Sequence, residues 1–110
     1  MACKLGLGRR IGAATMQIRW EEEALSDLIN IRVYIEEENP MAAGKLAGRI
    51  IDKVKLLADQ PLLGSQGRLH NTRELVITST PYTIIYHASA DLITILRVFH
   101  QARKWPKTMP

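Results

Sequence analysis

The hydrophobic positions of this chain change their spacing at Trp20. From Met16 up to this point, apolar and polar residues alternate, which is typical of a short β-strand with one apolar face. Beyond it, apolar residues recur at steps of three and four as far as Ile35, which predicts an amphipathic helix. The three acidic residues at 21–23 fall in its first turn, where the helix dipole favours negative charge.

A second helix is predicted directly after the first. Asn39 and Pro40 end the first helix, because a residue that precedes proline is pushed out of the α region. Proline is well suited to the first turn of a new helix, and apolar residues again recur at helical spacing over 43–57. Pro61 ends this pattern. We therefore expect a two-helix hairpin.

The chain beyond this hairpin has the pattern of a sheet. A Gly-, Ser- and Gln-containing stretch at 64–67 predicts a loop, and three apolar runs follow at 72–77, 81–87 and 92–100. Their short connections imply antiparallel neighbours. The expected fold class is therefore α+β, in the order β-α-α-β-β-β, with the hairpin packed on one face of an antiparallel sheet. We expect function at the strand ends and on the other, partly open face.

The length of 110 residues, 46% of them hydrophobic, suits one domain, which we assign to residues 16–110. Residues 1–15 are rich in Gly and Ala without periodicity and predict a flexible extension, with Met16 as an alternative start. No apolar run is long enough to span a bilayer, and the extension lacks the apolar centre of a signal peptide, so we expect a cytoplasmic protein. Cys3 is the single cysteine, so no metal site is expected.

Charge is unevenly distributed along the chain. Residues 16–60 hold six basic and nine acidic side chains, whereas residues 61–110 hold six basic and two acidic ones. The formal net charge is +4. A cationic C-terminal half attached to acidic helices suits a protein that meets nucleic acid through one face, although solvated surface arginines would give the same balance.

Several short motifs follow one another in a recognisable order. They are Ile18-Arg19-Trp20, Ala24 with Asp27-Leu28, Tyr34-Ile35, Asn39-Pro40, Pro61 with Gly64, Gly67-Arg68, Thr72-Arg73-Glu74-Leu75, Pro81-Tyr82 with Ile85-Tyr86, and Arg97-Val98 with His100 and Arg103. In order and spacing, this set resembles the RelE/ParE superfamily of toxins from bacterial type II toxin–antitoxin modules, which include plasmid stabilisation systems. The resemblance covers about residues 16–106. It implies the fold given above and an antitoxin partner with which the toxin forms a hetero-oligomer.

RelE-like members cut messenger RNA, generally at the ribosome, without a metal or other cofactor. The 2′-hydroxyl attacks the adjacent phosphate, so a base, an acid and cations are required around one phosphate. The resemblance implies Arg73 and Arg103 as phosphate-contacting cations, and His100 is the candidate for proton transfer. Further candidates for RNA contact are Arg68, Arg97, Lys104, Trp105 and Tyr82.

These residues also have structural interpretations. His100 suits the end of a strand as well as a catalytic site, and on sequence alone the structural role is favoured. Tyr82 alternates with Tyr86 on one face of a strand, where packing is the commoner role. Trp105 fits base stacking and attachment of the C-terminal tail equally well.

Two other activities are open. ParE-like members share the fold, lack the catalytic set of the RelE type and inhibit DNA gyrase. A third possibility is a non-catalytic module that binds its antitoxin and represses its own operon. The loop at 62–70 offers only Arg68 and His70, and Trp105 stands where a catalytic tyrosine is found in RelE-like enzymes. The combination of Arg73 with His100 and the following arginine nevertheless favours the messenger RNA endonuclease.

Overall fold

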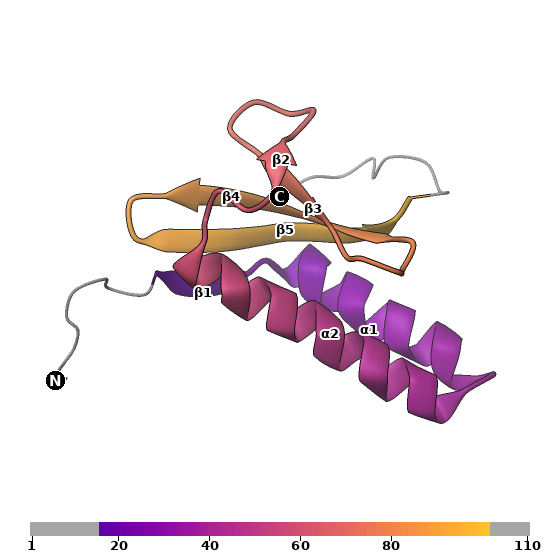
Figure 1. Ribbon diagram of the computed structural model, residues 1–110. Coiled ribbons are helices and arrows are strands. Elements are labelled where there is room, and N and C mark those ends of the chain that lie inside the picture. Colours follow the sequence, from indigo (N-terminus) through magenta and orange to yellow (C-terminus); the bar gives the residue numbers. More distant parts are fainter. Residues whose placement is uncertain (1–15, 102–110) are drawn as a thin grey trace, which may run out of the picture.

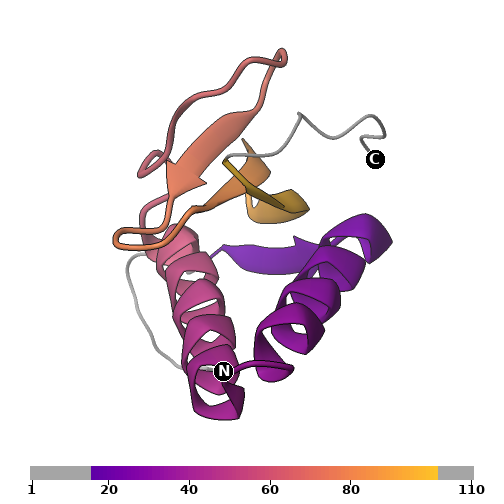
Figure 2. The same ribbon diagram turned by 90° about the vertical axis from the view of Figure 1, so that its right-hand side faces the viewer.

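The computed structural model describes residues 16–101. Residues 1–15, and the candidate site residues Arg103, Lys104 and Trp105, lie outside this range. The elements are β1 (Gln17–Trp20), α1 (Glu22–Glu36), α2 (Pro40–Asp59), β2 (Ser65–Gln66), β3 (Arg73–Val76), β4 (Tyr82–Ser89) and β5 (Leu92–His100). Figures 1 and 2 show both helices on one side of the sheet, which confirms the expected α+β layers.

The turn between the helices forms as the sequence predicts. Asn39 is the N-cap of α2, and its side-chain oxygen accepts a hydrogen bond from the amide of Ala42 at 3.1 Å. Pro40 occupies the first helical turn, where the missing N–H costs nothing. The amide of Asn39 itself donates to the carbonyl of Ile35 at 2.8 Å, so this residue ends one helix and begins the next.

The strand order across the sheet is β1-β5-β4-β3-β2. Antiparallel pairing holds for β2 with β3, β3 with β4 and β4 with β5, as the short connections predict. β1 instead runs parallel to β5, with Gln17 opposite Leu92 and Trp20 opposite Ile95. The chain between these two strands, which contains the α1–α2 hairpin and β2 to β4, is long enough for the crossover that a parallel pair needs. The last strand of the chain therefore lies inside the sheet.

The core lies between the hairpin and the sheet. Its fully or nearly buried residues from the helices are Ala24, Ile50, Val54 and Leu57, and those from the sheet are Ile77, Tyr82, Ile84, Tyr86, Ile93, Ile95 and Val98. A β-bulge interrupts the pairing of β4 with β5: Ile85 lies opposite Arg97, whereas Tyr86 lies opposite Ile95. Leu96 is therefore the extra residue, and the side chains beyond it change face. Within residues 16–101 no helix is long and apolar enough to cross a membrane.

Candidate functional site

Arg73 and Tyr86 together hold the loop that follows α2. The guanidinium of Arg73 donates to the carbonyl of Gly64 at 2.7 Å. The hydroxyl of Tyr86, on the neighbouring strand, accepts from the amide of Gly64 at 2.9 Å and donates to the carbonyl of Pro61 at 2.8 Å. These three bonds satisfy backbone groups of an irregular segment beside the core, and they give Arg73 a structural partner.

The surroundings of the Tyr86 hydroxyl shift its titration. Burial raises the pKa of Tyr86, an effect opposed by the hydrogen bond from Gly64 and by the positive charge of Arg73. The space around Gly64 is full: a Cβ there would lie 2.8 Å from the Tyr86 ring and 2.9 Å from the carbonyl oxygen of Glu74. Only glycine fits at this position without displacement of its neighbours.

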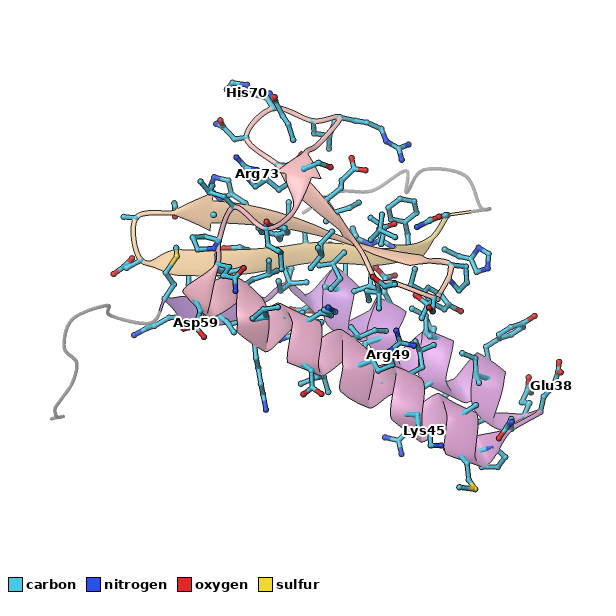
Figure 3. The ribbon with its side chains drawn as sticks, viewed as in Figure 1. Glu38, Lys45, Arg49, Asp59, His70 and Arg73 are labelled. Carbon is cyan, nitrogen blue, oxygen red and sulfur yellow. The ribbon has the colours of Figure 1, made fainter. Side chains whose placement is uncertain are left out.

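Arg73 also lines a hollow of about 450 Å³ beside the β2–β3 loop. Its other lining residues are Leu62, Gln66, His70, Asn71, Thr72, His87 and Ala88. Figure 3 shows His70 at the outer end of this loop and Arg73 closer to the sheet. Sequence reasoning ranked both histidines below His100, yet they are the histidines that share a hollow with Arg73. An arginine with two imidazoles makes this hollow suitable for an anionic or polar partner.

Arg97 joins β5 to α1. Its Nε and Nη2 atoms donate to the two carboxylate oxygens of Asp27 at 2.7 and 2.8 Å, and the amide of Val98 donates to the same carboxylate at 3.0 Å. The pKa of Arg97 is raised, first by the hydrogen bonds to Asp27. Its side chain is 19% exposed, and the hollow that it lines also holds the acidic residues at 21–23. This geometry attaches α1 to the sheet and disfavours contact with an RNA phosphate.

The remaining described candidates are engaged near the C-terminal end of β5. His100 lies opposite Tyr82, and the two rings meet edge to face with centroids 5.3 Å apart. Tyr82 is only 6% exposed, so its ring belongs to the core and offers little surface for base stacking. Arg68 forms an ion pair with Glu74 at 3.5 Å and lies over the ring of Phe99, 5.8 Å from its centroid.

Arg73 and His100 do not come together. Arg73 lies opposite Tyr86, whereas His100 lies opposite Tyr82 on the far side of the same strand. Four residues of strand correspond to roughly 13 Å, and the two strands that flank β4 are about 10 Å apart. The Cα atoms of Arg73 and His100 are therefore roughly 16 Å apart. Among residues 16–101, no three His, Cys, Asp or Glu side chains are grouped so as to hold a metal ion.

Two residues that position the candidate site, Asp27 and Tyr86, are hard to recognise from the sequence. Asp27 is an acidic residue near the apolar side of α1, but its partner is 70 positions away along the chain. The pattern of Tyr86 predicts packing, which is correct for its ring, but alternation cannot reveal what a hydroxyl will bind. Both contacts depend on how α1 and the loop after α2 pack against the sheet.

The family of the chain follows from its sequence taken as a whole. A sequence model described as the ParE toxin of the type II toxin–antitoxin system parDE matches residues 18–105. The chain belongs to the ParE toxin family. It is thus a type II toxin of the RelE/ParE superfamily, as the order of motifs predicts. The matched range includes every element of the fold apart from the first residue of β1.

Two relatives match this toxin over nearly the whole of their own length. Y4kP of Sinorhizobium fredii (strain NBRC 101917 / NGR234) is 42% identical over 93 residues, which are 84% of this chain and 96% of that protein. Toxin RelE2 of Caulobacter vibrioides (strain ATCC 19089 / CIP 103742 / CB 15) is 39% identical over 89 residues, which are 79% of this chain and 97% of that protein. Both relatives therefore match this chain from nearly one end of their own sequence to the other.

Solved structures share the fold of the toxin. A chain of the chromosomal ParDE toxin–antitoxin system from P. aeruginosa is matched with a TM-score of 0.71 and 24% identity, over 78% of this chain and 96% of that one. A chain of the toxin–antitoxin complex RelBE2 from Mycobacterium tuberculosis is matched with a TM-score of 0.59 and 19% identity, over 79% of this chain and 99% of that one. At this identity the likeness concerns the fold alone.

Proposed function

We propose that this toxin is of the ParE type and inhibits DNA gyrase by binding it, without cleaving RNA. The observation that supports the proposal is the separation of Arg73 from His100. Cleavage by 2′-hydroxyl attack needs a base, an acid and charge-stabilising cations around one phosphate, and a displacement of a few ångströms already removes most of the rate. Two residues more than 10 Å apart along β4 fall far outside this limit.

The hydrogen bonds of the candidate cations support the same proposal. Arg73 binds a backbone carbonyl and Arg97 binds Asp27, so both guanidinium groups stabilise the fold. A phosphate that took the donors now bound to these partners would leave each buried acceptor unpaired, at a cost of about 1–3 kcal/mol. A protein target makes no such demand, because it can bind the surface as it stands.

A messenger RNA endonuclease of the RelE type is the second candidate. It is favoured by the 39% identity to a protein named toxin RelE2, and by the place of His100 three residues before Arg103. In that case the site would be built from His100 and the segment that follows it, with Arg103, Lys104 and Trp105, and Arg73 would have only a structural role.

A cognate antitoxin is the partner that we propose for either activity. The structural relatives come from systems named as toxin–antitoxin pairs. The cationic half of this chain suits an acidic partner segment, since opposite charges increase the rate of encounter and favour the correct partner. Repression of the operon by this complex remains a further role, and both proposed targets place the toxin in the cytoplasm.

The deciding experiment measures both activities on one preparation of the full chain. Purified toxin is added to gyrase with relaxed plasmid and ATP, and separately to translating ribosomes with a defined messenger RNA. We expect supercoiling to be inhibited and the RNA to remain intact. His100→Ala should retain gyrase inhibition, because the exposed surfaces of the fold are unchanged. New RNA 5′ ends within codons that disappear in His100→Ala, with normal supercoiling, would establish the RelE type instead.

A further inference from the structure

The helical hairpin exposes a continuous apolar surface on the side that faces away from the sheet. Leu25, Ile29 and Val33 follow one another at steps of four along α1 and are 43%, 60% and 53% exposed. Residues at this spacing lie above one another on one side of a helix. Met41 and Ile51 of α2 are also exposed, at 74% and 38%. We call these five residues the outer face of the hairpin.

Helical geometry places the two parts of the outer face beside each other. The core residues Ala24 of α1 and Ala43 and Ile50 of α2 define the inner sides of the helices. Leu25 and Ile51 each come one residue later, a rotation of about 100°. Because the helices are antiparallel, these two rotations have opposite senses when the hairpin is seen from one end. Arg49, on the flank of α2 opposite to Ile51, contacts the β3–β4 connection, so Ile51 lies on the flank of α2 nearer α1, and Leu25 lies on the flank of α1 nearer α2. Figure 2 shows the sheet on the other side of the hairpin.

Contacts on the sheet side of the helices support this orientation. Arg49 of α2 donates to the carbonyl of Thr78 in the β3–β4 connection, and Asp27 of α1 binds Arg97 of β5. Neither residue belongs to the outer face. Gly44, one residue after Ala43, has no atom within 4 Å of the place where a Cβ would stand, so this side of α2 faces open space.

The charges of the two helices are complementary. α1 carries four acidic residues and one basic residue, whereas α2 carries four basic and two acidic residues. Exposed Glu22 and Glu36 border the outer face on α1, and exposed Lys45 and Lys55 border it on α2. Figure 3 shows Lys45 on the side of α2 that faces away from the sheet. A surface with one acidic and one basic half is self-complementary under a two-fold axis.

We propose that the outer face of the hairpin binds a second copy of this chain, with α1 of each copy against α2 of the other. The two-fold arrangement brings the apolar stripe of α1 onto the glycine-lined side of α2 and sets acidic borders against basic ones. α2 is roughly 30 Å long and two adjacent helices are roughly 20 Å wide, which gives about 600 Å² per copy. A total near 1,200 Å² is at the low end of specific interfaces, which fits a weak and reversible dimer.

Sedimentation equilibrium of the purified full chain, between about 1 and 100 µM, tests the proposal. We expect a monomer–dimer equilibrium for the native chain and at least a tenfold weaker one for Ile29→Glu. Leu62→Glu is the matched control, because Leu62 is 69% exposed but lies in the loop after α2. It should dimerise like the native chain. Circular dichroism shows whether each variant is folded.

Charge-reversal variants test the proposal without removing any apolar side chain. The variants Lys45→Glu/Lys55→Glu and Glu22→Lys/Glu36→Lys should each be monomeric, and an equimolar mixture of the two should form dimers again. A monomeric native chain, or dimers that Ile29→Glu leaves intact, would overturn the proposal. The same holds if the native chain is monomeric and Ile29→Glu instead abolishes antitoxin binding. Since neither gyrase nor RNA is involved, this result is separate from that of the proposed target.

Discussion

The carboxylate of Asp27 completes the edge of the sheet at Val98. β1 pairs with β5 only as far as Ile95, and the bulge that follows leaves the amide of Val98 without a strand neighbour on that side. Asp27 accepts this amide at 3.0 Å and also binds the guanidinium of Arg97 through both of its oxygens. A side chain from a helix thus replaces the missing strand and fixes the position of α1.

Removal of this carboxylate should destabilise the fold strongly. In Asp27→Ala, the largely buried Arg97 loses its counter-charge and the Val98 amide loses its acceptor, which we expect to cost about 3–5 kcal/mol. Urea denaturation followed by circular dichroism measures the change. The control is Arg32→Ala, whose ion pair with Glu36 is 3.9 Å long and exposed, and which should cost less than about 0.5 kcal/mol. Equal losses in the two variants would contradict a special role for Asp27.

A methyl group added at Gly64 should destabilise the fold, whereas one added at Gly44 should stabilise it. Gly64→Ala would force its Cβ against the Tyr86 ring and the Glu74 carbonyl, and we expect a loss of about 1–3 kcal/mol. Gly44→Ala meets nothing within 4 Å inside a helix, so it should stabilise the monomer by about 0.5–1 kcal/mol. Thermal unfolding of both variants in dilute solution checks the signs. A stable Gly64→Ala protein would mean that the loop after α2 yields easily.

Stability should fall in alkaline solution through Tyr86. Its pKa is raised in the fold above the ordinary value of about 10, so the folded state favours the neutral phenol. The corresponding stabilisation is complete below pH ~10 and is lost as the pH rises through the folded pKa. Tyr86→Phe removes this dependence, and it should also lose about 1–3 kcal/mol at neutral pH because the carbonyl of Pro61 and the amide of Gly64 lose their partner.

The measurement is the free energy of unfolding of both proteins at a series of pH values from neutral upward. The difference between native chain and Tyr86→Phe should shrink in the alkaline range. A constant difference at every pH would show that the phenol titrates alike in the folded and unfolded chains.

The cap between the helices should make a modest contribution. Asn39→Ala removes the side-chain oxygen that accepts the Ala42 amide, and we expect a loss of about 1 kcal/mol. Asn39→Asp keeps an acceptor at the same place and should retain the stability of the native chain. Chemical denaturation of the three proteins measures both effects. If Asn39→Ala is neutral, water replaces the cap without cost.

Most elements of this fold could be predicted because they depend on local chemistry, but β2 (Ser65–Gln66) lies in the stretch at 64–67 for which the sequence predicts a loop. Alternation and three-to-four spacing identify the strands and helices, and Asn39 with Pro40 locates the start of α2. The partner of β1 was not predictable in this way. A run from Gln17 to Trp20 shows which face is apolar, but it contains no information on the strand beside it or on the parallel direction.

The candidate site was harder to predict for the same reason. The sequence pattern around an arginine in a strand is the same whether its guanidinium binds a phosphate, a carbonyl or a carboxylate. For Arg73 the choice depends on Gly64, nine residues away, and for Arg97 it depends on Asp27, 70 residues away. Such pairs are determined by strand register and by the bulge at Leu96, which the pattern of residues around either partner does not encode.

The place of β5 between β1 and β4 has a consequence for biosynthesis. β5 joins β1 to the other three strands, and it is the last strand to leave the ribosome. A nascent chain can therefore form the helical hairpin before it can complete the core. A fragment that ends at Ser89 should accordingly show helical but no native sheet signal by circular dichroism. Translation that stops before β5 thus releases no folded toxin, and only a chain that includes β5 can adopt the toxin fold.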